Sequence, residues 1–141
     1  MTRVLFVCIH NSARSQIAEA WFNHITDDTC KAESAGIEPG TLNPLVVQAM
    51  AEIGIDISGK TTNSADAFLR EGKTYSCVVT VCNREAAEKC PTFPGLERQE
   101  HWSFPDPSGV TGTQAEKLAQ VREIRDAICR KIDEWVAELR A

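Results

Sequence analysis

The 141-residue sequence has no long apolar run and no block of basic residues. Its apolar segments are too short to cross a bilayer, so no membrane-spanning protein is expected. Fifteen lysines and arginines against twenty aspartates and glutamates give a formal net charge of −5, which argues against binding of nucleic acid. Hydrophobic residues make up 43% of the chain, an ordinary globular share that excludes a disordered protein.

Common cofactor and metal motifs are missing as well. There is no glycine-rich dinucleotide fingerprint and no Cys-x2-Cys pair, so neither an organic cofactor nor a zinc or other metal site is expected. No charged leader with an apolar segment follows Met1. Six cysteines without such a leader indicate a reducing compartment, in which clustered thiols are more often catalytic than structural. We therefore predict a cytoplasmic protein.

The order of the apolar segments predicts one α/β domain over residues 1–141. Buried strands are expected at residues 4–7, 31–35, 77–82 and 99–104. Helices are expected at residues 17–25, 42–53, 65–70 and 113–139, the last beginning with the Thr-x-x-Glu spacing of a capping box. Residues 83–98 are compatible with a short helix or a loop. Alternating strands and helices predict a three-layer, flavodoxin-like sandwich with a four-stranded parallel sheet.

The segment from Cys8 to Ser15 joins a predicted buried strand to a predicted helix, and five residues separate Cys8 from Arg14. Such a loop suits a tetrahedral oxyanion, because backbone N–H groups and the positive helix end face the anion while Arg14 clamps two of its oxygens. The same positive field favours a nucleophilic Cys8 thiolate. The alternative is a buried strand-end thiol, but the strand–loop–helix context favours the anion site. The predicted oxyanion-binding residues are Ile9, His10, Asn11, Ser12, Ala13, Arg14 and Ser15.

Three further candidates lie at or beyond predicted strand ends, which share one edge of a parallel sheet. Cys82 ends the predicted 77–82 strand, and Cys90 follows in a polar stretch. Asp106 stands between two prolines after the last strand, where a general acid could be held rigidly. The simpler alternatives are a core thiol for Cys82, a loop thiol for Cys90 and an ordinary Asp-Pro turn for Asp106.

Several segments in combination resemble the low-molecular-weight protein tyrosine phosphatase superfamily and, within it, the thioredoxin-coupled arsenate reductases. The matching segments are Val7-Cys8, Arg14-Ser15-Gln16, Ala18-Glu19, Ser34-Ala35-Gly36, Thr80-Val81-Cys82, Cys90-Pro91 and His101 through Pro107. The resemblance implies Cys8 as nucleophile, Arg14 as oxyanion clamp and Asp106 as general acid. It also implies a disulfide relay through Cys82 and Cys90, with a thioredoxin-like reductant as partner.

The same resemblance leaves the role of three polar residues open. Asn11, Glu19 and Ser34 match positions that help to bind a potassium ion in some reductases. Alternatively, Asn11 and Ser34 only hydrogen-bond each other.

The resemblance implies reduction of arsenate to arsenite as the leading activity. The rival is a phosphatase that hydrolyses phosphate monoesters, and a third possibility is a non-catalytic redox sensor that binds anions. The single tyrosine, Tyr75, and the Ser108-Gly109 pair after Asp106-Pro107 leave no evident aromatic walls for a phosphotyrosine ring. Arsenate and phosphate share charge and shape, so residual phosphatase activity is expected in either enzyme.

Overall fold

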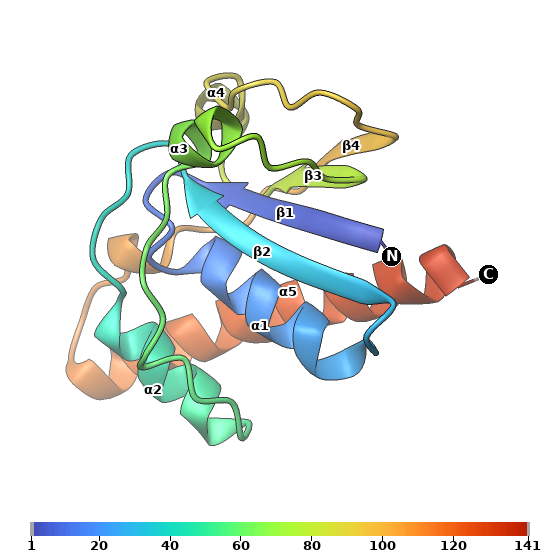
Figure 1. Ribbon diagram of the computed structural model, residues 1–141. Helices are drawn as coiled ribbons and strands as arrows, with labels where there is room; N and C mark the ends of the chain where they lie inside the picture. The colour runs from blue at the N-terminus through green and yellow to red at the C-terminus, as the bar shows by residue number, and fades with distance from the viewer. Residues whose placement is uncertain (1, 141) are drawn as a thin grey trace.

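The computed structural model describes residues 2–140 and contains one four-stranded sheet (Figure 1). Its strands are β1 (Thr2–Cys8), β2 (Cys30–Gly36), β3 (Cys77–Thr80) and β4 (Arg98–His101). They lie in the order β2-β1-β3-β4, and every neighbouring pair is parallel. This confirms the predicted four-stranded parallel α/β fold, with the β1 strand buried at the centre as its apolar sequence requires.

Helices cover both faces of the sheet. The helices α1 (Arg14–Ile25), α2 (Pro44–Glu52) and α5 (Gln114–Arg140) lie on one side, and α3 (Ala65–Arg70) lies on the other (Figure 1). The short helix α4 (Arg84–Ala87) follows β3, and a single 3-10 turn, η1 (Pro107–Gly109), precedes α5. The capping box at the start of α5 is confirmed, because the Thr113 and Glu116 side chains each accept a hydrogen bond from the other residue's amide.

Alternation along β1 decides which side chains reach which layer. Val4, Phe6 and Cys8 pack in the cluster formed with α1 and α5, whereas Leu5 and Val7 pack in the cluster formed with α3. Cys8 therefore lies on the side of the sheet from which α1 begins. Among residues 2–140, no helix is long and apolar enough to cross a membrane.

An aromatic cluster connects β4 to α5 and so fixes the turn that carries Asp106. The rings of Phe6, Trp102 and Trp135 lie with centroids 5.1–6.2 Å apart. Glu100 of β4 accepts a hydrogen bond from the indole N–H of Trp102 at 3.2 Å and from that of Trp135 at 2.8 Å. Both buried indoles are thereby satisfied, and the chain leaves β4 in a defined direction.

Two predicted strands are shorter in the structure. β3 ends at Thr80 rather than Cys82, and β4 ends at His101 rather than residue 104. Each ladder ends with one further main-chain hydrogen bond, from the Val81 N–H to the Val7 carbonyl and from the Trp102 N–H to the Thr80 carbonyl, and Val81 and Cys82 are still buried. The ambiguous stretch 83–98 contains the helix α4, then irregular chain, and ends with Arg98, the first residue of β4. That irregular chain is anchored by Phe93, which is 2% exposed and packs edge-on against Tyr75.

Candidate active site

The loop from Cys8 to Ser15 forms a tight bend between β1 and α1. Asn11 has φ +54°, a left-handed conformation that asparagine tolerates better than most residues. Ala13 stands at the N-cap of α1 and supplies no side-chain hydrogen bond to the helix. The first N–H groups of α1 are therefore left for an external acceptor, and an anion is the ligand that suits them best.

A neighbouring segment, residues 37–43, holds this loop from outside. Four of its backbone N–H groups donate hydrogen bonds of 2.7–3.1 Å to carbonyls of the loop. The bonds run from Ile37 to Cys8, from Glu38 to Ile9, from Gly40 to His10 and from Asn43 to Ser12. Because these four carbonyls are engaged on the outer side, the loop's N–H groups remain for the inner side. The segment thus shapes the loop into an anion cradle.

Gly36 permits the close approach of β2 to the loop. A Cβ atom at this position would lie 2.8 Å from the Asn11 nitrogen, 2.8 Å from the His10 carbonyl carbon and 2.9 Å from the Ile9 oxygen. All three are backbone atoms, which cannot rotate aside. Glycine at position 36 is therefore required by contact with the loop.

Cys8 is 2% exposed, and its sulfur lies at the floor of the cradle. It is 2.8 Å from the Ser15 hydroxyl, and it accepts a hydrogen bond from the Asn11 N–H at 3.2 Å. The Asn11 N–H directed at the sulfur, the adjacent Ser15 hydroxyl and the N-terminus of α1 are polar surroundings that suit a nucleophilic cysteine.

Asn11 is the centre of a buried polar network behind the cradle. Its Nδ2 donates to the Ser15 and Ser34 hydroxyls at 2.7 and 2.9 Å, and its Oδ1 accepts from the Asn63 N–H at 2.9 Å. Ser34 in turn donates to Glu19 at 3.0 Å. Asn11 and Ser34 therefore hydrogen-bond each other, which was the second of the two alternatives.

The same geometry does not fit a potassium ion. Asn11 directs its N–H group, not its oxygen, at Ser34, and the remaining oxygen of Glu19 is paired with the Lys60 ammonium. A cation at this place would need those oxygens free.

Arg14 lies with its guanidinium at the rim of the cradle and is almost fully buried. Nη1 donates to the Phe104 carbonyl at 3.1 Å, and Nη2 lies 3.6 Å from the Asp106 carboxylate. The sequence-distant turn at residues 105–107 therefore reaches the loop, as the sheet-edge argument predicts. The remaining N–H groups of Arg14 are those available to an oxyanion.

Asp106 caps η1 by accepting the Ser108 N–H at 2.9 Å, which fixes its orientation. Burial acts to raise the pKa of Asp106, but the Ser108 hydrogen bonds and the positive charges of Arg14 and His10 outweigh it, so the pKa lies below its ordinary value. The raised pKa that a general acid needs is therefore not found for Asp106 in this structure.

Cys82 lies next to Cys8 in the fold. β1 and β3 are paired so that Val7 is level with Thr80, and the Val81 N–H donates to the Val7 carbonyl at 2.8 Å. Cys82 is fully buried in the same cluster as Cys8. Burial raises the pKa of Cys82, the nearby Cys8 raises it further, and Arg14 opposes both effects.

Cys90 lies on the other side of the sheet from Cys82. It packs against the cluster formed by α3 and Phe93, and burial, with the nearby Cys82 and Asp66, raises its pKa to about 11. In contrast, α4, which connects the two cysteines, packs through Ala86 and Ala87 against the cluster that contains Cys82. The two thiols are therefore near enough for Cys82 to affect the pKa of Cys90, although they pack in different clusters.

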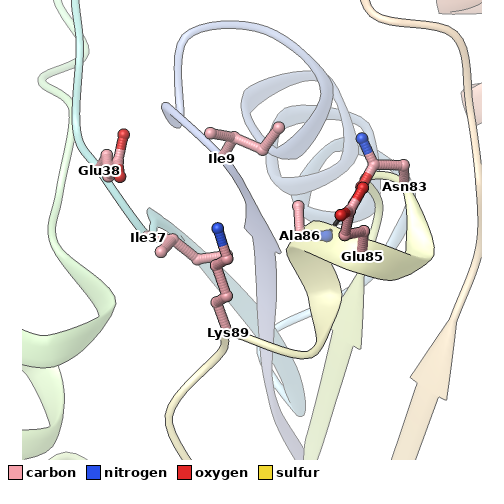
Figure 2. Close-up of a pocket in the computed structure, with 7 residues that line it drawn as sticks. All are labelled: Ile9, Ile37, Glu38, Asn83, Glu85, Ala86 and Lys89. Carbon is pink, nitrogen blue, oxygen red and sulfur yellow. Dashed lines mark hydrogen bonds between the residues drawn. The ribbon is translucent and has the colours of Figure 1, made fainter.

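A shallow pocket of about 230 Å³ separates α4 from the outer side of the cradle (Figure 2). One side of the pocket is lined by Ile9 of the loop and by Ile37 and Glu38, which follow β2. The other side is lined by four residues in or next to α4: Asn83, Glu85, Ala86 and Lys89. The α4 helix thus has free space on the side that faces Ile9.

The other conspicuous groups lie away from the cradle. Tyr75 is 3% exposed, donates to Glu33 at 3.0 Å and stacks near Arg3 at the beginning of β1, the opposite end of that strand from Cys8. It cannot form a wall for a ligand in the cradle. Cys77 and Cys129 are buried, and burial raises the pKa of each to about 12, as expected for inert core thiols.

Residues 3–141 match the family described as low molecular weight phosphotyrosine protein phosphatase. The chain belongs to this family. The arsenate reductase of Bacillus subtilis (strain 168) is 42% identical to it over 132 residues, which cover 94% of this chain and 93% of that protein. The expected resemblance to arsenate reductases within the phosphatase family is therefore confirmed.

Solved structures agree with this assignment. A structure described as an arsenate reductase in the phosphate binding state matches with a TM-score of 0.78 and 28% identity, covering 98% of each chain. A thioredoxin-dependent arsenate reductase of Corynebacterium glutamicum matches with a TM-score of 0.75 and 27% identity, covering 99% of this chain and 62% of that one.

Several groups that build the site carried no sequence signal. Segment 37–43 contributes backbone N–H groups, and Phe104 contributes a carbonyl, so neither has a diagnostic side chain. Residues 57–63, hereafter the backing segment, bring Lys60 to Glu19 and Asn63 to Asn11 across more than forty positions of sequence. Only Gly36, which directly follows the predicted strand 31–35 in a matching segment, could have been singled out beforehand.

Proposed function

We propose that this chain reduces arsenate to arsenite, with Cys8 as nucleophile and Cys82 and Cys90 as the thiols that accept the oxidation. The observation that carries this proposal is the pairing of β1 with β3, which buries the second thiol of Cys82 beside Cys8 at the anion cradle. A phosphatase needs one thiolate, whereas reduction of As(V) to As(III) needs two electrons and hence a second thiol.

In the first step the Cys8 thiolate attacks arsenic, and a hydroxyl leaves as water after it receives a proton from Asp106. Because the pKa of Asp106 is lowered in this structure, its carboxylate must gain the proton when the anion binds. An arsenate anion held by Arg14 supplies the cause, because its negative charge lies beside Asp106 and neutralises the arginine that kept the carboxylate ionised.

In the second step the Cys82 thiolate attacks the sulfur of the Cys8 adduct. A Cys8–Cys82 disulfide forms, and the sulfur–arsenic bond breaks with its electron pair passing to arsenic, so that As(V) becomes As(III) and arsenite leaves. The raised pKa of Cys82 means that this thiol must lose its proton as it reacts, and the Arg14 charge favours that loss.

In the third step the Cys90 thiolate attacks Cys82, which forms a Cys82–Cys90 disulfide and releases the Cys8 thiolate. Because Cys82 and Cys90 pack in different clusters, the segment between them, which includes α4, must rearrange, and the pocket beside Ile9 offers room for that change. α4 is only four residues long, Arg84–Ala87, and is therefore a weak element to open. A thioredoxin-like dithiol then supplies two electrons to Cys82–Cys90.

The test pairs arsenate-dependent NADPH consumption, in the presence of thioredoxin and its reductase, with hydrolysis of an aryl phosphate. Cys82→Ser is expected to abolish arsenate turnover and retain aryl phosphate hydrolysis, and Cys8→Ser to abolish both. Cys77→Ser is the matched control, since it removes a buried thiol from the other end of the same strand segment and is expected to keep both activities.

Each contrary outcome has a definite meaning. Normal arsenate reduction by Cys82→Ser would refute the relay. Hydrolysis of phosphate esters by the unmodified chain without any arsenate turnover would support the phosphatase alternative, and absence of both activities would support a redox sensor. Mass spectrometry of Cys90→Ser treated with arsenate should reveal a trapped Cys8–Cys82 disulfide.

A further inference from the structure

Glu19 carries a buried carboxylate behind the cradle that the proposed chemistry does not use. Its side chain is 6% exposed, and its Oε1 accepts the Ser34 hydroxyl at 3.0 Å. Its Oε2 is paired with the Lys60 ammonium and, among residues 2–140, with no other group. A buried carboxylate without a compensating charge is strongly unfavourable, so the whole charge balance of Glu19 depends on one lysine.

The hydrogen atoms of the network can be placed from chemistry alone, starting at this carboxylate. Glu19 only accepts, so the Ser34 hydroxyl must donate to it, and the Ser34 oxygen must then accept from Asn11 Nδ2. Asn11 Nδ2 uses its other hydrogen on the Ser15 oxygen. A Cys8 thiolate only accepts, so when Cys8 reacts as a thiolate the Ser15 hydroxyl hydrogen is the one directed at its sulfur.

The orientation of the Asn11 amide is independently fixed. Its Oδ1 accepts the backbone N–H of Asn63 at 2.9 Å and the Gln16 side-chain N–H at 3.2 Å, so its nitrogen must face the two serines. Asn63 belongs to the same backing segment as Lys60. Charge balance at Glu19 and amide orientation at Asn11 are thus both set by residues 57–63.

We propose that Lys60 is a positioning residue for the Cys8 thiolate. By balancing the charge of Glu19, its ammonium holds the Ser34 hydroxyl toward the carboxylate, and the Asn11 amide and Ser15 hydroxyl then point their hydrogens toward the sulfur. Without the ammonium, the buried Glu19 carboxylate must draw on another donor, so Ser34 is free to turn and the ordered set of donors at Cys8 is lost. The role rests on the proposed function only in taking Cys8 as the reacting group.

The chain provides a close control for a generic charge effect. Lys73 pairs with Glu33 at 3.2 Å, and Glu33 lies on β2 one residue before Ser34. That pair also includes a partly buried carboxylate and a partly exposed lysine. Its contacts, however, are Arg3 and Tyr75, and none of its hydrogen bonds leads to the cradle.

The experiment measures the rate at which iodoacetamide alkylates Cys8 at pH 7, resolved from the other cysteines by peptide mass spectrometry. Lys60→Met keeps the aliphatic stem and removes the charge, and we expect it to slow Cys8 alkylation about threefold to thirtyfold, the range typical for coupling through a packed polar network. Lys60→Arg restores the charge and should recover most of the rate. Lys73→Met should leave the rate unchanged.

A double-mutant cycle separates action through Glu19 from a direct effect on Cys8. In a Glu19→Gln background, Lys60→Met should cause no further loss, because the carboxylate on which Lys60 acts is gone. The proposal is overturned if folded Lys60→Met is alkylated at Cys8 at the unmodified rate, or if Lys73→Met slows alkylation equally. It is also overturned if the losses of rate caused by Lys60→Met and by Glu19→Gln simply add in the double variant. Alkylation of Cys8 needs no arsenate, so this test is independent of the proposed function. If Lys60→Met slows alkylation but the unmodified chain reduces no arsenate, the positioning role stands and only the proposed function is refuted.

Discussion

Gly36→Ala tests how closely the cradle is held against the sheet. The new Cβ atom would lie 2.8 Å from the Asn11 nitrogen and from the His10 carbonyl carbon, whereas ordinary contacts begin at 3.4 Å, so the loop must withdraw by about 0.6 Å. Gly36 does not have a positive φ, and alanine can therefore adopt its backbone conformation. The whole effect is expected to come from displacement of the loop.

The displacement sets the expected size of the effect. A reacting group misplaced by about 1 Å costs on the order of 100-fold in rate, so a shift of this size should lower kcat/KM for arsenate about 10- to 100-fold. Overpacking should also lower the free energy of unfolding by about 1–3 kcal/mol. Both can be measured, the first by coupled NADPH consumption and the second by urea unfolding.

Gly59→Ala is the matched control for this substitution. It adds the same methyl group where no atom lies within 4 Å and where φ is not positive. It should therefore keep full turnover and an unchanged or slightly higher free energy of unfolding. If Gly36→Ala matched this control in both measurements, the close contact between β2 and the loop would not constrain the cradle.

Three further predictions concern other parts of the molecule. Phe93→Ala should lower the free energy of unfolding by about 3 kcal/mol, measured by urea titration, because the ring is buried against Tyr75. A loss below about 1 kcal/mol would show that Phe93 does not anchor the chain that follows α4. Glu33→Gln should cost about 1 kcal/mol at pH 7. Burial raises the pKa of Glu33, but Lys73, Tyr75 and Arg3 lower it more, so the pKa in the folded protein is below the ordinary value of about 4.3. The ionised carboxylate therefore stabilises the fold at pH values above about 4.3, and this contribution is lost as the pH falls through the lowered pKa. An equal loss at pH 3 would contradict this sign. Asp106→Asn should reduce arsenate turnover about 100-fold or more, with steady-state kinetics as the measurement, whereas an unchanged kcat would exclude it as the general acid.

The sequence by itself was sufficient for the parts of the fold that depend on contiguous residues. The apolar run at 4–7 is too uninterrupted for a half-exposed strand, and it lies buried at the centre of the sheet. The loop from Cys8 to Ser15 could be recognised because the strand, the bend and the helix start that make an anion site follow one another in the chain. Arg14 and Asp106 converge because parallel strands end at one edge.

Strand ends and thiol placement needed the tertiary structure. Spacing alone put Cys82 inside a strand and left Cys90 in an undefined stretch, but pairing ends at Thr80, and Cys90 packs on the opposite face of the sheet. Which face a residue reaches depends on where the chain crosses the sheet edge, and a short helix such as α4 has too few residues for a clear periodic pattern.

The apolar order and the Cys8–Arg14 spacing were thus readable from the sequence, since they express local periodicity and the chemistry of adjacent groups. The shape of the cradle was not readable from the sequence, because it depends on backbone groups and on a glycine that carry no diagnostic side chain. These are the amides of residues 37–43, the missing Cβ of Gly36 and the Phe104 carbonyl. The pairing of Lys60 with Glu19 likewise exists only once the chain between them has folded back behind the loop. Contacts of this kind are decided by long-range packing, which no local pattern encodes.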